Sequence, residues 1–274
     1  MSSPDTAQRS LNHWSEAGRA EMQAFYALAT EDYRQLVRAR DWAADLRVHA
    51  VDGRVRLLDV ACGSGKFPAA LLAAGLPAEP SVRADLLDPS AFSIAEARSV
   101  LAPPFVAGEE HEVVLQDFDR RGAYDVAWAT HALYALPPDD LAAGAARMVA
   151  ALRPGGFGAV AQAVGRSHYL AFYEAYRPAF APDVAPYTDA EGVAAALRSA
   201  GADVAVQTLH YRTGSVDRAV VEGFLQRCAF DDMVSLEAME AREPLAGYLA
   251  DCRGADGTYT FRHEVDLITW EQPA

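Results

Sequence analysis

Segments typical of buried strands alternate along this chain with segments typical of helices, and no other feature of the sequence restricts the fold as strongly. Strands that alternate with helices of roughly ten to fifteen residues build a parallel sheet covered on both faces. The sequence therefore predicts an α/β fold with a doubly wound, seven-stranded, mostly parallel sheet and an N-terminal helical cap. The predicted strands cover residues 55–61, 82–87, 111–115, 124–129, 157–164, 204–211 and 259–270, and the predicted helices cover residues 10–50, 67–74, 91–101, 138–152, 188–200 and much of 217–251.

Capping residues and prolines set several of these boundaries. We expect Thr30 to cap a second helix within residues 10–50, and Thr188 to form a capping box with Glu191. Pro244 is expected to divide the helical region 217–251, because proline interrupts a helix interior.

The length of 274 residues suits one large α/β domain, or one such domain with a small cap. No internal repeat or low-complexity linker divides the chain, which favours one cooperative unit. We expect residues 1–50 to form the cap and residues 51–274 the α/β domain, with insertions on its ligand side around residues 165–187 and 213–257.

The charge balance argues against polyanionic partners. There are 24 basic and 38 acidic residues and a formal net charge of −14, which disfavours nucleic acid and anionic membranes. The apolar stretches are too short to span a membrane. The three cysteines are an odd number, and the first residues lack the apolar core of a secretory leader, which favours reduced thiols in a cytoplasm. We therefore expect a cytoplasmic protein, monomeric or homodimeric, that acts on a small molecule; its many arginines and alanines suggest a GC-rich bacterial source.

Three ligand classes compete for the glycine-rich loop that follows the first predicted strand. A Walker A loop is excluded because Val60 and Phe67 stand where it needs Gly and Ser or Thr. A dinucleotide fingerprint that begins at Gly63 fails because Pro68 stands at its third glycine. Asp59 would repel a pyrophosphate but suits a nearby ammonium or sulfonium group. The loop therefore favours S-adenosylmethionine.

The segment Asp59-Val-Ala-Cys-Gly-Ser-Gly65 resembles motif I of class I S-adenosylmethionine-dependent methyltransferases, with Ala61 where that motif most often has glycine. Later family motifs resemble Asp88-Pro-Ser90, Gln116-Asp117-Phe118, Tyr124-Asp-Val126 and Leu152-Arg-Pro-Gly-Gly156, so the resemblance covers roughly residues 50–165. It implies a Rossmann-like fold and S-adenosylmethionine as cofactor. The cofactor-binding residues that it implies are Asp59, Ala61, Cys62, Gly63, Ser64, Gly65, Asp88, Pro89, Ser90, Asp117, Phe118 and Thr130.

Two of these carboxylates have specific expected roles. Asp88 is expected to accept hydrogen bonds from the ribose hydroxyls, in competition with Asp85 on the same predicted strand. Asp117 is expected to border the adenine.

A narrower resemblance involves the segment after the fourth predicted strand. Thr130-His-Ala-Leu-Tyr134 is similar to the histamine N-methyltransferase group of small-molecule enzymes, as is the helical segment at residues 224–230. That group commonly has a glutamine that touches substrate at the position of His131, so the resemblance does not by itself imply an amine substrate for this chain.

Aromatic residues and one histidine supply the remaining site candidates. His131 is expected to act as a general base or to position the substrate, and Tyr134 to lie near the sulfonium or the substrate. The candidate substrate contacts are Tyr26, Tyr33, Tyr169 and Tyr173, for which core packing is the alternative. No metal is expected, because the histidines lack ligand spacing and Ala129-Thr130 stands where metal-dependent relatives need carboxylates.

The sequence thus predicts an enzyme that transfers a methyl group from S-adenosylmethionine to nitrogen or oxygen of a small molecule, in bacterial secondary metabolism. Two alternatives stay open. One is an enzyme of the same fold that uses the cofactor without methyl transfer, by intramolecular cyclisation or elimination that releases methylthioadenosine. The other is a protein that binds the cofactor without catalysis.

Overall fold

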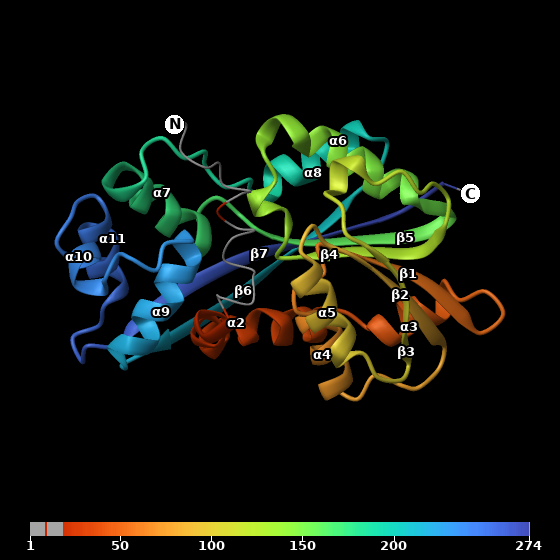
Figure 1. Cartoon of the computed structure of the whole chain (residues 1–274), viewed down its shortest axis with the longest axis horizontal. Helices are drawn as coiled ribbons and strands as arrows, with labels where there is room; N and C mark the ends of the chain where they lie inside the picture. Colours follow the sequence, from red (N-terminus) through yellow and green to blue (C-terminus); the bar gives the residue numbers. More distant parts are fainter. Residues whose placement is uncertain (1–8, 10–18, 274) are drawn as a thin grey trace.

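The computed structural model describes residue 9 and residues 19–273. A seven-stranded sheet forms its centre, in the order β3-β2-β1-β4-β5-β7-β6 (Figure 1). The strands are β1 (Arg54–Val60), β2 (Ser81–Leu87), β3 (Phe105–His111), β4 (Tyr124–Thr130), β5 (Leu152–Ala163), β6 (Ala205–Ser215) and β7 (Tyr259–Glu271). Strands β1 to β5 pair in parallel, whereas β7 runs antiparallel to both of its neighbours. The predicted doubly wound, mostly parallel sheet is therefore confirmed.

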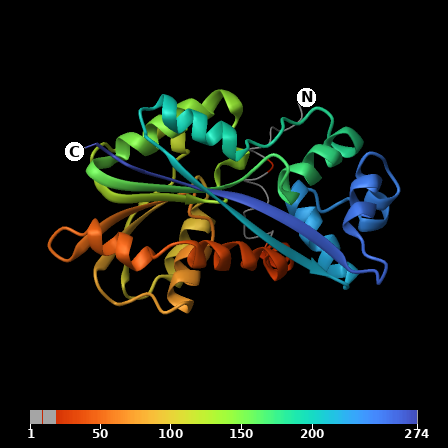
Figure 2. The ribbon, with the colours of Figure 1, turned by 180° about the vertical axis from the view of Figure 1, so that it is seen from behind.

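Helices cover both faces of the sheet, as Figures 1 and 2 show from opposite sides. They are α2 (Arg19–Ala39), α3 (Trp42–Val48), α4 (Lys66–Ala73), α5 (Ala91–Val100), α6 (Pro138–Ala151) and α8 (Ala190–Ser199). On one face α6 and α8 pack through Met148 and Leu197, and on the other α2, α3 and α4 pack through Leu36, Trp42 and Phe67. Most residues of the parallel strands β1, β2, β4 and β5 are thus buried on both faces, which explains their apolar sequences.

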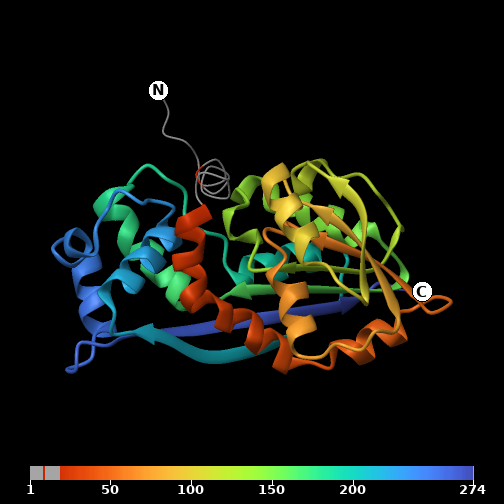
Figure 3. The same ribbon diagram turned by 60° about the horizontal axis from the view of Figure 1, so that its bottom comes forward.

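A second group of helices gathers at the end of the sheet to which β6 and β7 extend beyond the parallel strands (Figure 3). These are α7 (His168–Phe180), α9 (Arg218–Ala229), α10 (Leu236–Glu240) and α11 (Leu245–Cys252). Phe172, Phe224 and Phe261 are fully buried in their common core, and Ala29 of α2 joins them. Helix α2 therefore links the sheet to this helical group, and both contribute walls to the site described below.

The third strand lies earlier than the sequence predicted. Strand β3 begins at Phe105, directly after Pro103-Pro104, and the predicted strand 111–115 is wrong. A short 3-10 helix, η2 (Leu115–Asp117), occupies the end of that segment. Strand β3 lies at the edge of the sheet, where most of its residues are at least partly exposed, so its polar sequence gave no strand signal.

Two predicted caps are also corrected. Helix α2 runs through Thr30, whose hydroxyl donates to the Tyr26 carbonyl instead of starting a new helix. The N-cap of α8 is Asp189, which accepts from the Gly192 amide, and not Thr188. Pro244 does separate α10 from α11, as predicted. The predicted helix over residues 10–18 lies outside the described residues.

Candidate active site

A cavity of about 310 Å³ opens at the carboxyl ends of β1, β2 and β4, where ligands bind in doubly wound sheets. We call it the larger cavity. Of the predicted cofactor residues and aromatic candidates, the structure brings twelve to its wall. They are Tyr26, Tyr33, Asp59, Ala61, Cys62, Gly63, Ser64, Asp88, Pro89, Thr130, His131 and Tyr134.

The loop between β1 and α4 takes its shape from left-handed backbone conformations. Gly63 has φ of 51° and Gly65 has φ of 67°, values that favour glycine. A Cβ on Gly65 would lie 2.9 Å from the Cα of Ala97, so Gly65 is also needed for the close approach of α5. Ala61 has φ of 48°, which is strained for a residue with a side chain. The departure from motif I at this position therefore has a physical cost.

Two buried carboxylates face the larger cavity from adjacent strand ends. Asp59 is 3% exposed, and its Oδ2 has no hydrogen-bond partner among the described residues. Burial raises the pKa of Asp59 to about 7, and the nearby Asp88 adds to this rise. Asp88 accepts from the Gly63 and Ser90 amides, yet burial still raises its pKa to about 6. Both carboxylates would therefore gain from a ligand that donates hydrogen bonds or carries positive charge.

Asp85, the competing acid on β2, is engaged elsewhere. It accepts from the Glu109 amide at 2.7 Å and from the Tyr124 hydroxyl at 3.0 Å, and it does not line the larger cavity. Asp88 is thus the acid of this strand that faces the cavity.

Four predicted cofactor residues do not line either cavity. Gly65 caps α4, and Ser90 caps α5 by accepting from Ser93. Asp117 is exposed on η2, and Phe118 packs in the core against His111. At the position expected for adenine, the cavity is bordered by the neighbouring residues Val114, Leu115 and Gln116. At the position expected for adenine, the predicted residues Asp117 and Phe118 are therefore next in sequence to the side chains that line the cavity, but do not line it themselves.

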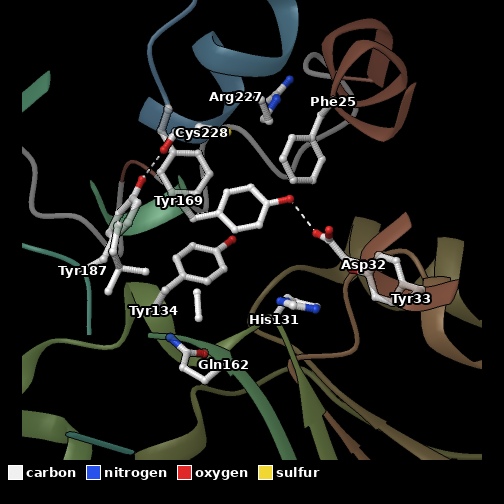
Figure 4. Close-up of a pocket in the computed structure, with 13 residues that line it drawn as sticks. Phe25, Asp32, Tyr33, His131, Tyr134, Gln162, Tyr169, Tyr187, Arg227 and Cys228 are labelled. Atoms are coloured by element: carbon white, nitrogen blue, oxygen red, sulfur yellow. Dashed lines mark hydrogen bonds between the residues drawn. The ribbon is translucent and has the colours of Figure 1, made fainter. Parts of the chain in front are cut away.

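A second, smaller cavity of about 70 Å³ lies between β4, β5, α2, α7 and α9 (Figure 4). Its walls are mostly aromatic, and three of its residues also line the larger cavity. These shared residues are Tyr33, His131 and Tyr134. The two spaces therefore adjoin at the residues predicted to be catalytic or to contact substrate.

His131 stands at this junction with an unusual backbone and an unpartnered nitrogen. Its φ of 52° is left-handed, and Tyr33 contacts its ring edge-on with centroids 5.7 Å apart. Its Nε2 is buried without a hydrogen-bond partner among the described residues. Burial lowers the pKa of His131 to about 4, so the imidazole is neutral at pH 7. Strained backbone at a cavity wall is typical of functional residues.

Polar groups that the sequence reasoning missed line the smaller cavity. Gln162 is 1% exposed; its Nε2 donates to the Thr188 carbonyl at 2.7 Å, while its Oε1 has no partner among the described residues. Asp32, which is 3% exposed, accepts from the hydroxyls of Tyr169 and Tyr211. One sequence signal pointed to Asp32, because it lies on the helical face of Ala29 and Leu36, three and four residues away.

The aromatic candidates separate between the two cavities. Tyr26 lines only the larger cavity, where its hydroxyl lies 3.1 Å from Ser64 Oγ and the Lys66 ammonium lies 4.2 Å from its ring. Tyr169 lines only the smaller cavity. Tyr173 lines neither, because it is buried and stacks on Tyr187 with ring centroids 3.7 Å apart.

Comparison with known proteins identifies the fold that holds this site. Residues 58–157 match the family model described as a methyltransferase domain. The chain carries a methyltransferase domain. The match runs from the end of β1 to the middle of β5 and so includes the glycine loop, Asp88 and His131. The resemblance of the sequence to class I methyltransferases is thereby confirmed.

Solved structures extend this likeness over most of the chain. A protein of Bacillus halodurans C-125 assigned as a methyltransferase is 16% identical, with 85% of this chain and 99% of that chain covered and a TM-score of 0.59. Magnesium protoporphyrin IX methyltransferase of Synechocystis PCC 6803, solved with bound S-adenosylmethionine, is 15% identical, with 77% and 92% covered and a TM-score of 0.52. The 4+2 cyclase SpnF is 20% identical, with 87% and 81% covered and a TM-score of 0.50. At these identities the likeness shows the fold alone.

No curated protein matches this chain in sequence. No helix in the described part of the chain is long and apolar enough to cross a membrane.

Proposed function

We propose that this protein transfers a methyl group from S-adenosylmethionine to nitrogen or oxygen of a small molecule, in bacterial secondary metabolism. The observation that carries the proposal is the junction of the two cavities. The larger cavity ends at Tyr33, His131 and Tyr134, and the smaller, aromatic cavity begins at the same residues. A donor and an acceptor held in these two spaces would meet at one place, which is the geometric requirement for group transfer.

The cofactor is S-adenosylmethionine, and the residues of the larger cavity fit it. The unpartnered Oδ2 of Asp59 suits the ammonium of the methionine moiety. Asp88 lies at the adjacent strand end, where its oxygens would accept from the ribose hydroxyls. Lys66 is half-buried in the wall of the larger cavity, and burial lowers its pKa. Its ammonium would supply a cation for the carboxylate of the cofactor's methionine moiety. When bound, the cofactor supplies a methyl group that the positive charge on sulfur makes reactive.

The chain's own residues then have three tasks. Tyr33 and Tyr134 would line the passage between donor and acceptor and keep water out of it. The neutral His131 would orient the acceptor through a hydrogen bond, because a base with a pKa of about 4 is too weak to take the acceptor's proton efficiently at pH 7. The aromatic walls would bind a compact, partly apolar substrate.

The test is a labelled-methyl assay with a panel of small phenols, alcohols and amines. Transfer of label to one of them, and loss of cofactor binding in Asp88→Ala without loss of fold, would support the proposal. Tight cofactor binding with no turnover over a broad panel would favour a binding protein instead.

A second candidate is favoured by the size of the smaller cavity. About 70 Å³ is well below the roughly 300 Å³ of ordinary small-molecule sites, and its walls are largely aromatic. Such a space suits a reaction within the cofactor's own aminobutyrate chain, without a second substrate. Incubation of the protein with S-adenosylmethionine alone separates the two candidates, because release of methylthioadenosine contradicts methyl transfer.

A further inference from the structure

A buried carboxylate on α2 is held by two phenols from distant parts of the chain. Asp32 Oδ2 accepts from the Tyr169 hydroxyl of α7 at 2.5 Å, and Asp32 Oδ1 accepts from the Tyr211 hydroxyl of β6 at 2.8 Å. Asp32 and Tyr169 line the smaller cavity, whereas Tyr211 does not. Figure 4 shows the Tyr169 ring in the middle of the cavity with its hydroxyl directed at Asp32.

No ion pair joins Asp32 to a cation within the range that the structure describes. A buried carboxylate without such a partner is costly in its charged form. The titratable groups around it are Glu31 and Tyr33 on α2, Tyr169 on α7, Tyr211 on β6, Cys228 and Arg227 on α9, His131 after β4, and His263 on β7, which stacks on Tyr211.

Burial raises the pKa of Asp32 to about 7, although the two phenols lower it and Glu31 raises it further. A group with such a pKa exchanges its proton near neutral pH, which is the condition for efficient acid–base catalysis. His131, at the same cavity, has a pKa near 4 because it is buried, and is the weaker proton acceptor.

We propose that Tyr169 and Asp32 form a proton relay that receives the hydrogen of the methyl acceptor. This inference rests on the proposed methyl transfer. Tyr169 Oη takes the proton from the acceptor oxygen or nitrogen and passes its own proton to Asp32 Oδ2. In the same reaction the bond from the methyl carbon to sulfur breaks, its electron pair stays on sulfur, and a bond from that carbon to the acceptor forms. Asp32 later releases the proton to solvent.

The relay defines the substrate class. The acceptor must carry a hydrogen that it loses on methylation, so the substrates are hydroxyl compounds or amines that lie against the Tyr169 hydroxyl. In this scheme Tyr169 is the catalytic residue, and Asp32 acts through it as a positioning and proton-storing residue. Tyr211 holds the second oxygen of Asp32 from outside the cavity.

The first test needs no methyl acceptor. The infrared spectrum of the full-length wild type minus that of Asp32→Asn, both with S-adenosylhomocysteine and recorded from pH 5 to 9, should contain a protonated carboxyl band that fades near pH 7; the bands of Asp59 and Asp88 are common to both proteins and cancel. A difference spectrum without this band at pH 5 to 6 would overturn the relay, whether or not any acceptor is methylated.

The second test uses two matched variants that each remove one phenol from the same carboxylate. With an acceptor from the labelled-methyl panel, we expect Tyr169→Phe to lower kcat by about 100-fold or more, with little change in KM for the cofactor. Tyr211→Phe should lower kcat much less and move the acidic limb of the pH profile upward, because Asp32 loses a hydrogen bond that favours its charged form.

Equal losses of kcat in the two variants would mean that Asp32 is only structural, and would overturn the relay. So would disappearance of the limb near pH 7 in His131→Gln, because the proton would then go to the histidine. If the wild type methylates no member of the panel, the proposed function fails, and the infrared titration alone decides whether Asp32 stores a proton.

Discussion

At the scale of single residues, the strain at Ala61 makes a prediction that concerns stability alone. A left-handed backbone costs a side-chain-bearing residue about 1–2 kcal/mol, and glycine is free of most of that cost. Ala61 has φ of 48°. We expect Ala61→Gly to raise the free energy of unfolding by about 0.5–1 kcal/mol, which is less than the strain relieved because glycine also increases the entropy of the unfolded chain. Denaturant unfolding of the ligand-free protein measures it.

Gly63→Ala is the matched control, because Gly63 has nearly the same φ and a Cβ there would meet no atom within 4 Å. It should destabilise by about 0.5–1 kcal/mol, because backbone strain exceeds the gain from the lower chain entropy of unfolded alanine. If both substitutions destabilise the protein, backbone strain does not control the stability of this loop.

At the scale of helices and strands, the sequence predicted elements whose residues face the core and failed where they do not. Strands β1, β2 and β4 are buried on both sides, and their apolar runs were found with boundaries correct within a residue or so. Edge strand β3 was missed because its residues are polar and partly exposed. The apolar run that replaced it in the prediction includes Val114 and Leu115, which line the larger cavity.

The site residues likewise divide into those that local sequence predicted and those that it did not. Asp59 and Asp88 end two successive parallel strands, and such ends meet at one edge of the sheet, so local sequence placed them together. Asp32, Gln162 and Tyr211 come from elements far apart in the chain. Their contacts depend on how α2, β5 and β6 are placed by the packing of the whole fold, which no local pattern encodes.

The corrected cap of α8 gives a prediction at this scale. The Asp189 side chain accepts from the Gly192 amide at 2.8 Å, whereas the Thr188 hydroxyl donates to the Leu136 carbonyl. We expect Asp189→Ala to lower the free energy of unfolding by about 1 kcal/mol, as loss of an N-cap does. Glu191→Ala is the control for the predicted capping box; if it costs as much as Asp189→Ala, the box contributes after all.

At the scale of the whole molecule, buried titratable groups oppose one another as the pH falls. Burial raises the pKa of Asp32 and of Asp59 to about 7, so between about pH 4 and 7 the folded protein holds protons that the unfolded chain lacks. These two groups therefore favour folding more strongly as the pH falls through that window. Buried histidines do the reverse. Burial lowers the pKa of His263 to about 3 and that of His168 well below its ordinary value.

Below about pH 6.5 the unfolded chain binds protons at these histidines, whereas the folded protein does not. Their contribution to the free energy of unfolding therefore decreases as the pH falls. The carboxyls offset this loss until about pH 4, and below it both states hold the carboxyl protons. Acid unfolding should therefore be steepest below pH 4.

A single substitution separates the contribution of a buried histidine to the pH dependence of stability from that of the carboxyls. His263 is 1% exposed, and its Nε2 lies 2.8 Å from Thr213 Oγ1. In His263→Asn the proton uptake on unfolding at this position is gone, so the variant should gain on the wild type by about 1.4 kcal/mol per pH unit as the pH falls from 6 to 4. Denaturant unfolding at three pH values in this range measures the difference, with the same substitution at exposed His210 as the control. If the difference in the free energy of unfolding between the variant and the wild type stays constant with pH, His263 is protonated in the folded protein. A charged imidazole would then be buried between β7 and α7.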